Sequence, residues 1–149
     1  MAVLLLCGCT VDKQCRVSYK VEMWALFQGD SLAADTTIAY YQRYDSITVQ
    51  GVGNDSILYD NVKSVGTLVL QLRPDTTLTA YSLIYHGQTD TLYIRHNNTI
   101  RFVSLACGQM VLHTIEEVWS GSGWIDSVAI LDPTLEVKGK DNIRIIAHE

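Results

Sequence analysis

The sequence lacks runs of basic residues, helix-spaced apolar residues and the short motifs that mark common enzymes. Its 149 residues carry a mild net charge of −5, and no cluster of Lys or Arg suggests a nucleic-acid-binding face. No Gly-x-Ser-x-Gly elbow, phosphate-binding loop, paired-glycine nucleotide fingerprint or His-Glu-x-x-His helix is present. These absences argue against nucleic-acid binding and leave no cofactor, metal or catalytic residue to predict.

Apolar residues are abundant, at 48% of the chain against 18% charged residues, which excludes intrinsic disorder. A chain of this length fits one domain. Apolar and polar residues alternate along much of it, as they do in half-buried β-strands. This alternation predicts strands at residues 17–27, 67–72, 78–85, 91–95, 100–105, 110–118, 125–131 and 143–146, with one or two more within 38–49.

Turn-forming residues separate these segments at intervals of roughly 8–12 residues. Asn97-Asn98 tolerates positive φ and predicts a tight two-residue hairpin, whereas residues 28–35 and 50–56 are expected to be mobile loops. We therefore expect an all-β fold, an antiparallel β-sandwich or meander of about eight or nine strands, with a closed β-barrel as the alternative. The other turn signals are Arg73-Pro74-Asp75, His86-Gly87-Gln88, Gly121-Ser122-Gly123 and Asp132-Pro133.

The N-terminus is apolar through residue 8 and then becomes polar at once. The apolar run is too short to span a bilayer, which takes about 20 residues, but it is typical of the end of a signal peptide. Leu6-Cys7-Gly8-Cys9 resembles the lipobox of bacterial lipoproteins, whose last cysteine receives the lipid. We predict a residual signal-peptide segment at 1–8, a lipid tether at 9–15 and a single β domain at 16–149. The alternative is a buried first strand with two incidental thiols.

The two remaining cysteines, Cys15 and Cys107, are candidates for a disulfide in an oxidising compartment. The bridge would close a loop of about 90 residues, for which the chain-entropy model gives roughly 4–5 kcal/mol as an upper figure. Two independent buried thiols are the alternative, and geometry decides between the two. We favour the bridge.

The aromatic residues favour rings with a polar tip, with eight tyrosines and three tryptophans against two phenylalanines. Such rings suit a surface that recognises sugar or protein. Tyr and Trp are also preferred strand residues, so packing within the sheets is the alternative. The candidate binding residues are Tyr40, Tyr41 and Tyr44, which cluster in the sequence, and Trp119 and Trp124, which flank a glycine-rich turn.

Asp followed by Ser or Thr, and then by an aliphatic residue or Thr, occurs seven times. Random placement would give on the order of one match. The pattern resembles the O-glycosylation site that Bacteroidetes use on exported proteins. The structural alternative is an Asp that ends a turn before a β-forming pair begins a strand. The predicted glycosylated residues are Ser31, Thr36, Ser46, Ser56, Thr76, Thr91 and Ser127.

The segment 113–126 contains the remaining titratable candidates. His113 and Glu117 are expected to share one strand face, where they would flank a metal or, more ordinarily, form a surface ion pair. Glu116 or Glu117 together with Asp126 would suit a hydrolase if the two carboxylates lie about 5–10 Å apart in a cleft.

Four segments carry a family resemblance: Asp90-Thr91-Leu92-Tyr93-Ile94, Ala106-Cys107-Gly108, Trp124-Ile125-Asp126-Ser127-Val128-Ala129-Ile130 and Asn142-Ile143-Arg144-Ile145. With them, the C-terminal two thirds of the chain resembles an uncharacterised family of Bacteroidetes lipoproteins of about this length. The resemblance implies a β fold and a place in the cell envelope. The family carries no established activity, so it implies no mechanism.

Three functions remain open. The favoured one is a noncatalytic protein-binding or structural module, lipid-anchored in the cell envelope, at the outer membrane facing the periplasm, with an outer-membrane or other envelope protein as its partner. The second is a glycan-binding lipoprotein, and the third a carboxylate-based hydrolase. A flat apolar patch would favour the first, a concave row of exposed aromatic rings the second, and a carboxylate pair in a cleft the third.

Overall fold

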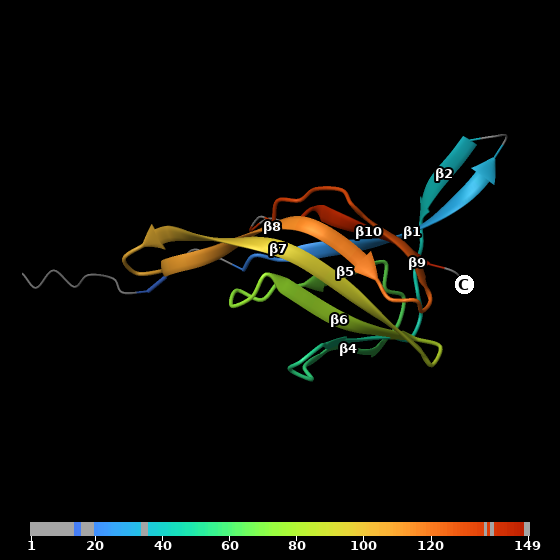
Figure 1. Cartoon of the computed structure of the whole chain (residues 1–149), viewed down its shortest axis with the longest axis horizontal. Helices are drawn as coiled ribbons and strands as arrows, with labels where there is room; N and C mark the ends of the chain where they lie inside the picture. Colours follow the sequence, from blue (N-terminus) through green and yellow to red (C-terminus); the bar gives the residue numbers. More distant parts are fainter. Residues whose placement is uncertain (1–13, 16–19, 34–35, 136, 138, 148–149) are drawn as a thin grey trace, which may run out of the picture.

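The computed structural model describes residues 14–15, 20–33, 36–135, 137 and 139–147, and the side chains of these except at 31–38. Within these ranges the chain forms ten β-strands and no helix, and the strands are arranged in two sheets (Figure 1). The all-β sandwich expected from the alternating sequence is confirmed, and the alternative of a closed barrel is wrong.

The first sheet contains β1 (Met23–Ala33), β2 (Thr36–Tyr41), β5 (Thr67–Leu70), β9 (Ile125–Ile130) and β10 (Asp141–Ala147). The first half of β1 pairs with β5, and its second half runs beyond β5 and pairs with β2. On its other side β1 pairs with β10 in parallel, which corrects the expectation of a purely antiparallel fold. Parallel pairing needs a long crossover, and here the crossover contains the whole second sheet.

The second sheet is antiparallel, with the strand order β4-β3-β6-β7-β8. Among the described residues, its edge strand β4 pairs only with β3, so no described strand lies along the outer side of β4. The five strands are β3 (Ile47–Gly51), β4 (Ile57–Val62), β6 (Leu78–Tyr85), β7 (Gln88–Ser104) and β8 (Gly108–Ser120).

Alternate residues of both sheets point into a shared core. Phe27 and Tyr44 meet edge to face with ring centroids 4.8 Å apart, and Trp124 lies 5.6 Å from Tyr44. Burial of a large apolar side chain contributes about 1.5–3 kcal/mol, so this layer dominates the stability of the fold. The fully buried aliphatic residues around the rings include Ile47, Leu68, Leu70, Leu83, Leu92, Ile94, Ile143 and Ile145.

The predicted hairpin at Asn97-Asn98 is wrong, because both residues lie within the 17-residue strand β7. They pair across the ladder with Thr114 and His113. The turn that ends β7 comes later, at residues 105–107, and Gly108 follows it with a φ of 72°. Asn98 stays in the strand because its side chain has buried hydrogen-bond partners that a turn residue would lack.

The expected loop at residues 28–35 is also wrong in part. The segment Gln28–Ala33 belongs to β1 and forms a six-pair ladder with β2. This β1–β2 hairpin projects from the body at one end of the molecule, and the outer part of β7 and β8 extends past the other strands at the opposite end (Figure 1). The two ends, the β1–β2 hairpin and the β7–β8 tip (residues 100–111), carry the candidate sites.

Candidate functional site

A pocket of about 400 Å³ lies at the base of the β1–β2 hairpin. We name it the Tyr40 pocket. It combines an aromatic ring with two carboxylates, those of Asp30 and Asp126, which come from strands far apart in the sequence. Its lining residues are Gly29, Asp30, Tyr40, Gln42, Asp126, Ile146 and Ala147.

Gly29 determines where the Tyr40 ring can lie. The two residues are direct partners in the β1–β2 register. A Cβ atom on Gly29 would stand 2.3 Å from the ring of Tyr40. The ring can therefore lie over position 29 only because glycine has no side chain. The neighbouring Tyr41 is 77% exposed and, as the next residue in the strand, points to the opposite face.

Two of the five candidate binding residues are wrong, because they belong to the core. Tyr44 is buried, and its hydroxyl donates to the carbonyl of Ala147 at 3.3 Å. Trp124 is also buried, and its Nε1 donates to the carbonyl of Leu83 at 3.0 Å. Both rings satisfy their polar atoms within the protein and cannot stack on a ligand.

Trp119 is half-buried on the outer face of β8, where its ring stacks on Tyr93 with centroids 5.3 Å apart. The guanidinium of Arg95 lies 5.4 Å from the Trp119 ring centre and forms an ion pair with Glu117. The contact across the hairpin is therefore with Tyr93 of β7, and Trp119 is covered by neighbours of its own sheet. Of the five candidates, Tyr40 and Tyr41 remain as exposed rings.

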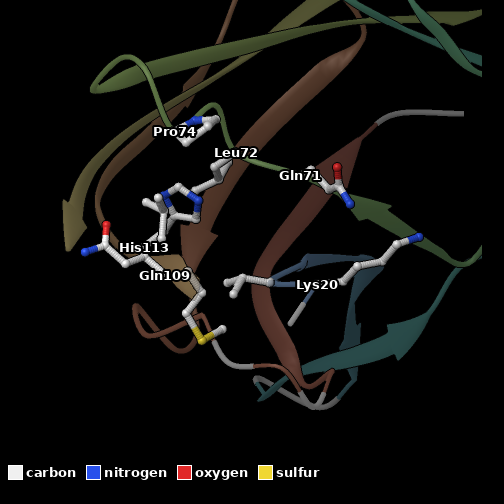
Figure 2. A pocket seen from close by; sticks show the side chains of 9 residues that line it. Lys20, Gln71, Leu72, Pro74, Gln109 and His113 are labelled. Atoms are coloured by element: carbon white, nitrogen blue, oxygen red, sulfur yellow. The ribbon is translucent and has the colours of Figure 1, made fainter. Parts of the chain in front are cut away.

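A second pocket, of about 340 Å³, opens where the β7–β8 tip leaves the sandwich. We name it the His113 pocket. Figure 2 shows His113 and Gln109 on one side of it, with Lys20 and Gln71 on the other. Its remaining walls are mostly apolar: Val21, Leu72, Pro74, Met110 and Val111.

Behind this pocket lies a buried polar network that was not predicted. The side-chain Oδ1 of Asn98 lies 2.7 Å from Nδ1 of His96 and 2.7 Å from Nδ1 of His113. The Asn98 Nδ2 donates to the carbonyls of Thr76 and Pro74, at 2.7 and 3.3 Å, which identifies Oδ1 as the atom facing the rings. Both histidines must then donate from Nδ1.

The tautomer assignment is consistent with the next hydrogen bond in the chain. Nε2 of His96 lies 2.8 Å from Oγ1 of Thr79, and the same hydroxyl oxygen accepts the backbone N–H of Arg73 at 2.9 Å. The Thr79 hydroxyl therefore donates to His96. Nε2 of His113 makes no hydrogen bond with the residues that the structure describes, and it is left as an acceptor on the wall of the pocket.

Both histidines of this network are neutral at pH 7. Burial and, to a smaller extent, the neighbouring His96 together lower the pKa of His113 from its ordinary 6.5 to about 4. Burial also lowers the pKa of His96, against smaller opposing effects of the Asn98 hydrogen bond and the Glu116 charge. A neutral His113 can accept a hydrogen bond from a ligand, but a base this weak is poorly matched to proton transfer at pH 7.

The expected pairing of His113 with Glu117 on one face is wrong. β7 and β8 shift register between Arg95 and His96, so Arg95 opposes Glu117 while His96 opposes Ile115. At this shift β8 has one residue more than β7, so the positions of β8 that point inward and outward are exchanged beyond it. As a result His113 points into the core, and Glu117 pairs with Arg95 outside.

Two of the carboxylates singled out from the sequence have different neighbours in the structure. Asp126 lines the Tyr40 pocket together with Asp30, whereas Glu117 is paired with Arg95 on the outer face of β7 and β8. Among the described residues, no three His, Cys, Asp or Glu side chains are placed to hold a metal ion.

A disulfide joins Cys15 to Cys107, with Cα atoms 4.7 Å apart and a sequence separation of 92. It ties the segment that precedes β1 to the turn of the β7–β8 tip. The alternative of two independent thiols is wrong. Cys9, the predicted lipidation site, lies outside the described residues.

The predicted glycosylation sites differ in exposure. Ser56 and Ser127 are exposed, at the start of β4 and on β9, while Ser46, Thr76 and Thr91 are half-buried. Asp90, which precedes Thr91, is buried and accepts backbone N–H groups of Thr91, Gly123 and Ile125, so it has a structural role of its own. Ser31 and Thr36 lie in β1 and β2, and their side chains are outside the described set.

The edge strand β4 carries an exposed apolar surface. Ile57 is 58% exposed, and Leu58 and Val62 of the same strand are also exposed. The hydroxyl of Tyr59 accepts the backbone N–H of Val69 at 2.8 Å, which fastens β4 to β5 of the other sheet. An edge with exposed apolar residues that is held rigidly in this way is suited to contact with another protein chain.

A family model matches residues 46–147, about two thirds of the chain, and its description is a family of unknown function, DUF6452. The chain belongs to this family. The matched residues include β3 to β10 and the β7–β8 tip, and they begin after the β1–β2 hairpin. No curated protein and no solved structure matches the chain. Within the described residues, no helix is long and apolar enough to cross a membrane.

Proposed function

We propose that this protein is a noncatalytic, lipid-anchored module of the bacterial cell envelope that binds another envelope protein through the open edge of β4. The observation that carries the proposal is the exposed apolar strand Ile57–Val62, whose outer backbone groups face no other strand among the described residues. A partner segment that adds to this edge would gain main-chain hydrogen bonds together with apolar contacts.

Two features support specific binding at this edge. The β3–β4 ladder shifts register twice and Asp60 is exposed on the strand, and both features limit unspecific strand pairing. The Tyr59 hydrogen bond to β5 fixes the edge in advance, which lowers the entropic cost of binding.

The test is affinity capture from native envelope membranes. Ile57→Lys and Leu58→Lys place charge on the edge and should reduce recovery of a partner at least tenfold, by about 1.4 kcal/mol or more. Leu78→Lys is the matched control, because Leu78 is an exposed apolar residue on the interior strand β6. Equal recovery with the edge variants and the control would contradict the proposal.

The lipid anchor has its own test. Behind a complete lipoprotein signal peptide, the chain should incorporate a fatty-acid probe, and Cys9→Ala should abolish the labelling. Placement at the outer membrane, facing the periplasm of a Bacteroidetes cell, follows from this anchor and from the sequence resemblance. Undiminished labelling of the Cys9 variant would remove the anchor from the proposal.

A second candidate function, glycan binding, is favoured by the Tyr40 pocket. An exposed tyrosine ring beside two carboxylates and an amide is a set of groups that can stack on a sugar and bond its hydroxyls. Tyr40→Ala should abolish binding on an oligosaccharide array. Tyr41→Ala is the matched control on the opposite face of the same strand, and equal loss in both variants would exclude the pocket as the site.

Glycosylation of the exposed Asp-Ser sites is part of the same proposal. Protein isolated from its native envelope should exceed the sequence mass plus lipid by sugar-sized increments. Ser56→Ala and Ser127→Ala should each remove one increment, since both side chains are exposed. A native mass without increments would contradict glycosylation. The Asp-Ser/Thr pattern would then be explained by Asp residues that end turns just before strands begin.

A further inference from the structure

The β7–β8 tip exposes three large apolar side chains at the end of the molecule. Leu105 at the turn is 98% exposed, and Ile100 and Phe102 on β7 are 67% and 61% exposed. Ile100 and Phe102 lie two residues apart and therefore share one face. Across the ladder Ile100 pairs with Val111, which lines the His113 pocket, so the apolar face continues from the tip to the pocket wall.

The charge of the tip differs from that of the rest of the chain. From Asn97 to Ile115 the sequence holds one charged residue, the exposed Arg101, whereas the whole chain has a net charge of −5. Lys20 adds a second cation on the far wall of the adjoining pocket. An apolar stretch that carries a cation and, from Asn97 to Ile115, no carboxylate suits the headgroup region of an anionic bilayer.

The disulfide sets the distance between this tip and the predicted anchor. Cys107 lies in the tip and holds Cys15 with a Cα–Cα distance of 4.7 Å. Cys9 precedes Cys15 by six residues, and an extended chain spans at most about 3.3–3.6 Å per residue, which gives a reach of about 20 Å. A lipid on Cys9 therefore brings the tip within one short tether of the membrane surface.

We infer that the β7–β8 tip docks on the lipid bilayer, with Leu105, Phe102 and Ile100 inserted among the acyl chains and Arg101 at the headgroups. The tip is a second membrane contact in addition to the lipid, and it fixes the orientation of the domain. The β1–β2 hairpin at the opposite end then points away from the membrane (Figure 1). The inference builds on the lipid anchor of the proposed function, yet the tip can be tested without any lipid on the protein.

The test uses residues 9–149 with Cys9→Ser, which retains every residue that the structure describes and carries no acyl chain. The probe is vesicles of phosphatidylethanolamine and phosphatidylglycerol, with binding measured by flotation. We expect the protein to float with the vesicles. Leu105→Ser should weaken the partition constant about tenfold, and Leu105→Ser with Phe102→Ser roughly a hundredfold.

Leu78→Ser is the matched control, because Leu78 is an exposed leucine on β6 that lies outside both the tip and the β4 edge, and the partition of this variant should not change. Circular dichroism should show the same fold in every variant. The inference is overturned if the unmodified tip does not float, or if the tip variants float as well as the control. It is also overturned if sedimentation shows a dimer that Leu105→Ser dissociates, since a second copy would then cover the tip.

The two proposals can fail separately. Vesicle binding without fatty-acid labelling of Cys9 would support membrane docking of the tip and contradict the lipid anchor. Fatty-acid labelling without vesicle binding would support the lipid anchor and contradict membrane docking of the tip.

Discussion

The two projecting ends of this protein are both β-hairpins, but they differ in what stabilises them and in the side chains that they expose. The β7–β8 tip is closed by the Cys15–Cys107 disulfide, is backed by a buried network of two histidines and an asparagine, and exposes apolar side chains. The β1–β2 hairpin relies on six ladder pairs and on a glycine under a tyrosine ring. The difference is in keeping with the two roles proposed above, attachment at the tip and ligand binding at the hairpin.

The family match divides the molecule in the same place. Residues 46–147 include the tip and the β4 edge, whereas the Tyr40 and Tyr41 strand precedes the matched range. The tip and the edge therefore lie within the matched residues, and the β1–β2 hairpin lies before them.

The largest expected effect concerns the attachment of the tip. Cys15→Ser should lower the free energy of unfolding by up to about 4–5 kcal/mol, because the bridge closes a loop of roughly 90 residues in the unfolded chain. Denaturant titration under non-reducing conditions measures the loss. Reduction of the unsubstituted protein should reproduce it, and reduction of the variant should add nothing. Two free thiols on alkylation of the denatured, non-reduced protein would show that no disulfide holds the tip, and the contrast between the two ends would then be wrong.

A pH effect should follow from the network behind the tip. The pKa of His113 is about 4 in the folded protein and near its ordinary 6.5 in the unfolded chain. The folded state therefore resists protonation, so its stability is complete above about pH 6.5 and falls by up to about 3 kcal/mol as the pH drops to 4. Urea titrations at pH 7, 5.5 and 4 measure this decline.

His113→Gln is the control for the pH dependence. It should reduce the decline between pH 6.5 and 4, whatever it does to the stability at pH 7, because His113 no longer titrates and only His96, whose pKa burial also lowers, remains. A decline of unchanged slope in this variant would mean that other groups destabilise the protein in acid.

A smaller effect is expected at the β1–β2 hairpin. Gly29→Ala places a Cβ atom 2.3 Å from the Tyr40 ring and should cost about 1–2 kcal/mol as the ring is displaced. Adding Tyr40→Ala should recover most of that loss, since the clash partner is then absent. If the double variant is no more stable than Gly29→Ala alone, the Tyr40 ring does not depend on Gly29 for its place.

The smallest effect is expected for Tyr41→Ala, which should change the unfolding free energy by less than about 0.5 kcal/mol. Tyr41 is exposed and lies on the face away from the Tyr40 pocket. Thermal denaturation measures the change. A large loss would show that Tyr41 packs against the protein, and the hairpin would then resemble the tip more than the comparison allows.

Much of the fold was predictable from the sequence because alternation at period two survives wherever one face of a strand is buried. The segments around Leu83 and Ile94 show it clearly, and both are strands. Asn97 and Asn98 misled the prediction, since turn propensity is a local signal and the buried partners of Asn98 come from distant residues. The continued inward alternation through Leu92, Ile94, His96 and Asn98 was the available clue.

The candidate sites were less predictable than the fold. Tyr44 and Trp124 have the composition of binding residues, and their burial depends on how the two sheets pack. Asp30 and Asp126 both line the Tyr40 pocket although they are far apart in the chain, and no sequence spacing reveals this. The β-bulge that separates His113 from Glu117 likewise leaves no mark in the alternation before the pairing is known.

The most direct test of the central claim compares the two ends in one membrane. The lipidated protein is reconstituted into vesicles that contain brominated lipids, with a tryptophan introduced by Leu105→Trp in one variant and by Tyr41→Trp in the other. The fluorescence added at position 105 should be strongly quenched, and that added at position 41 should not. Equal quenching at both positions, or quenching at position 41 alone, would contradict a membrane-facing tip and a membrane-distal hairpin.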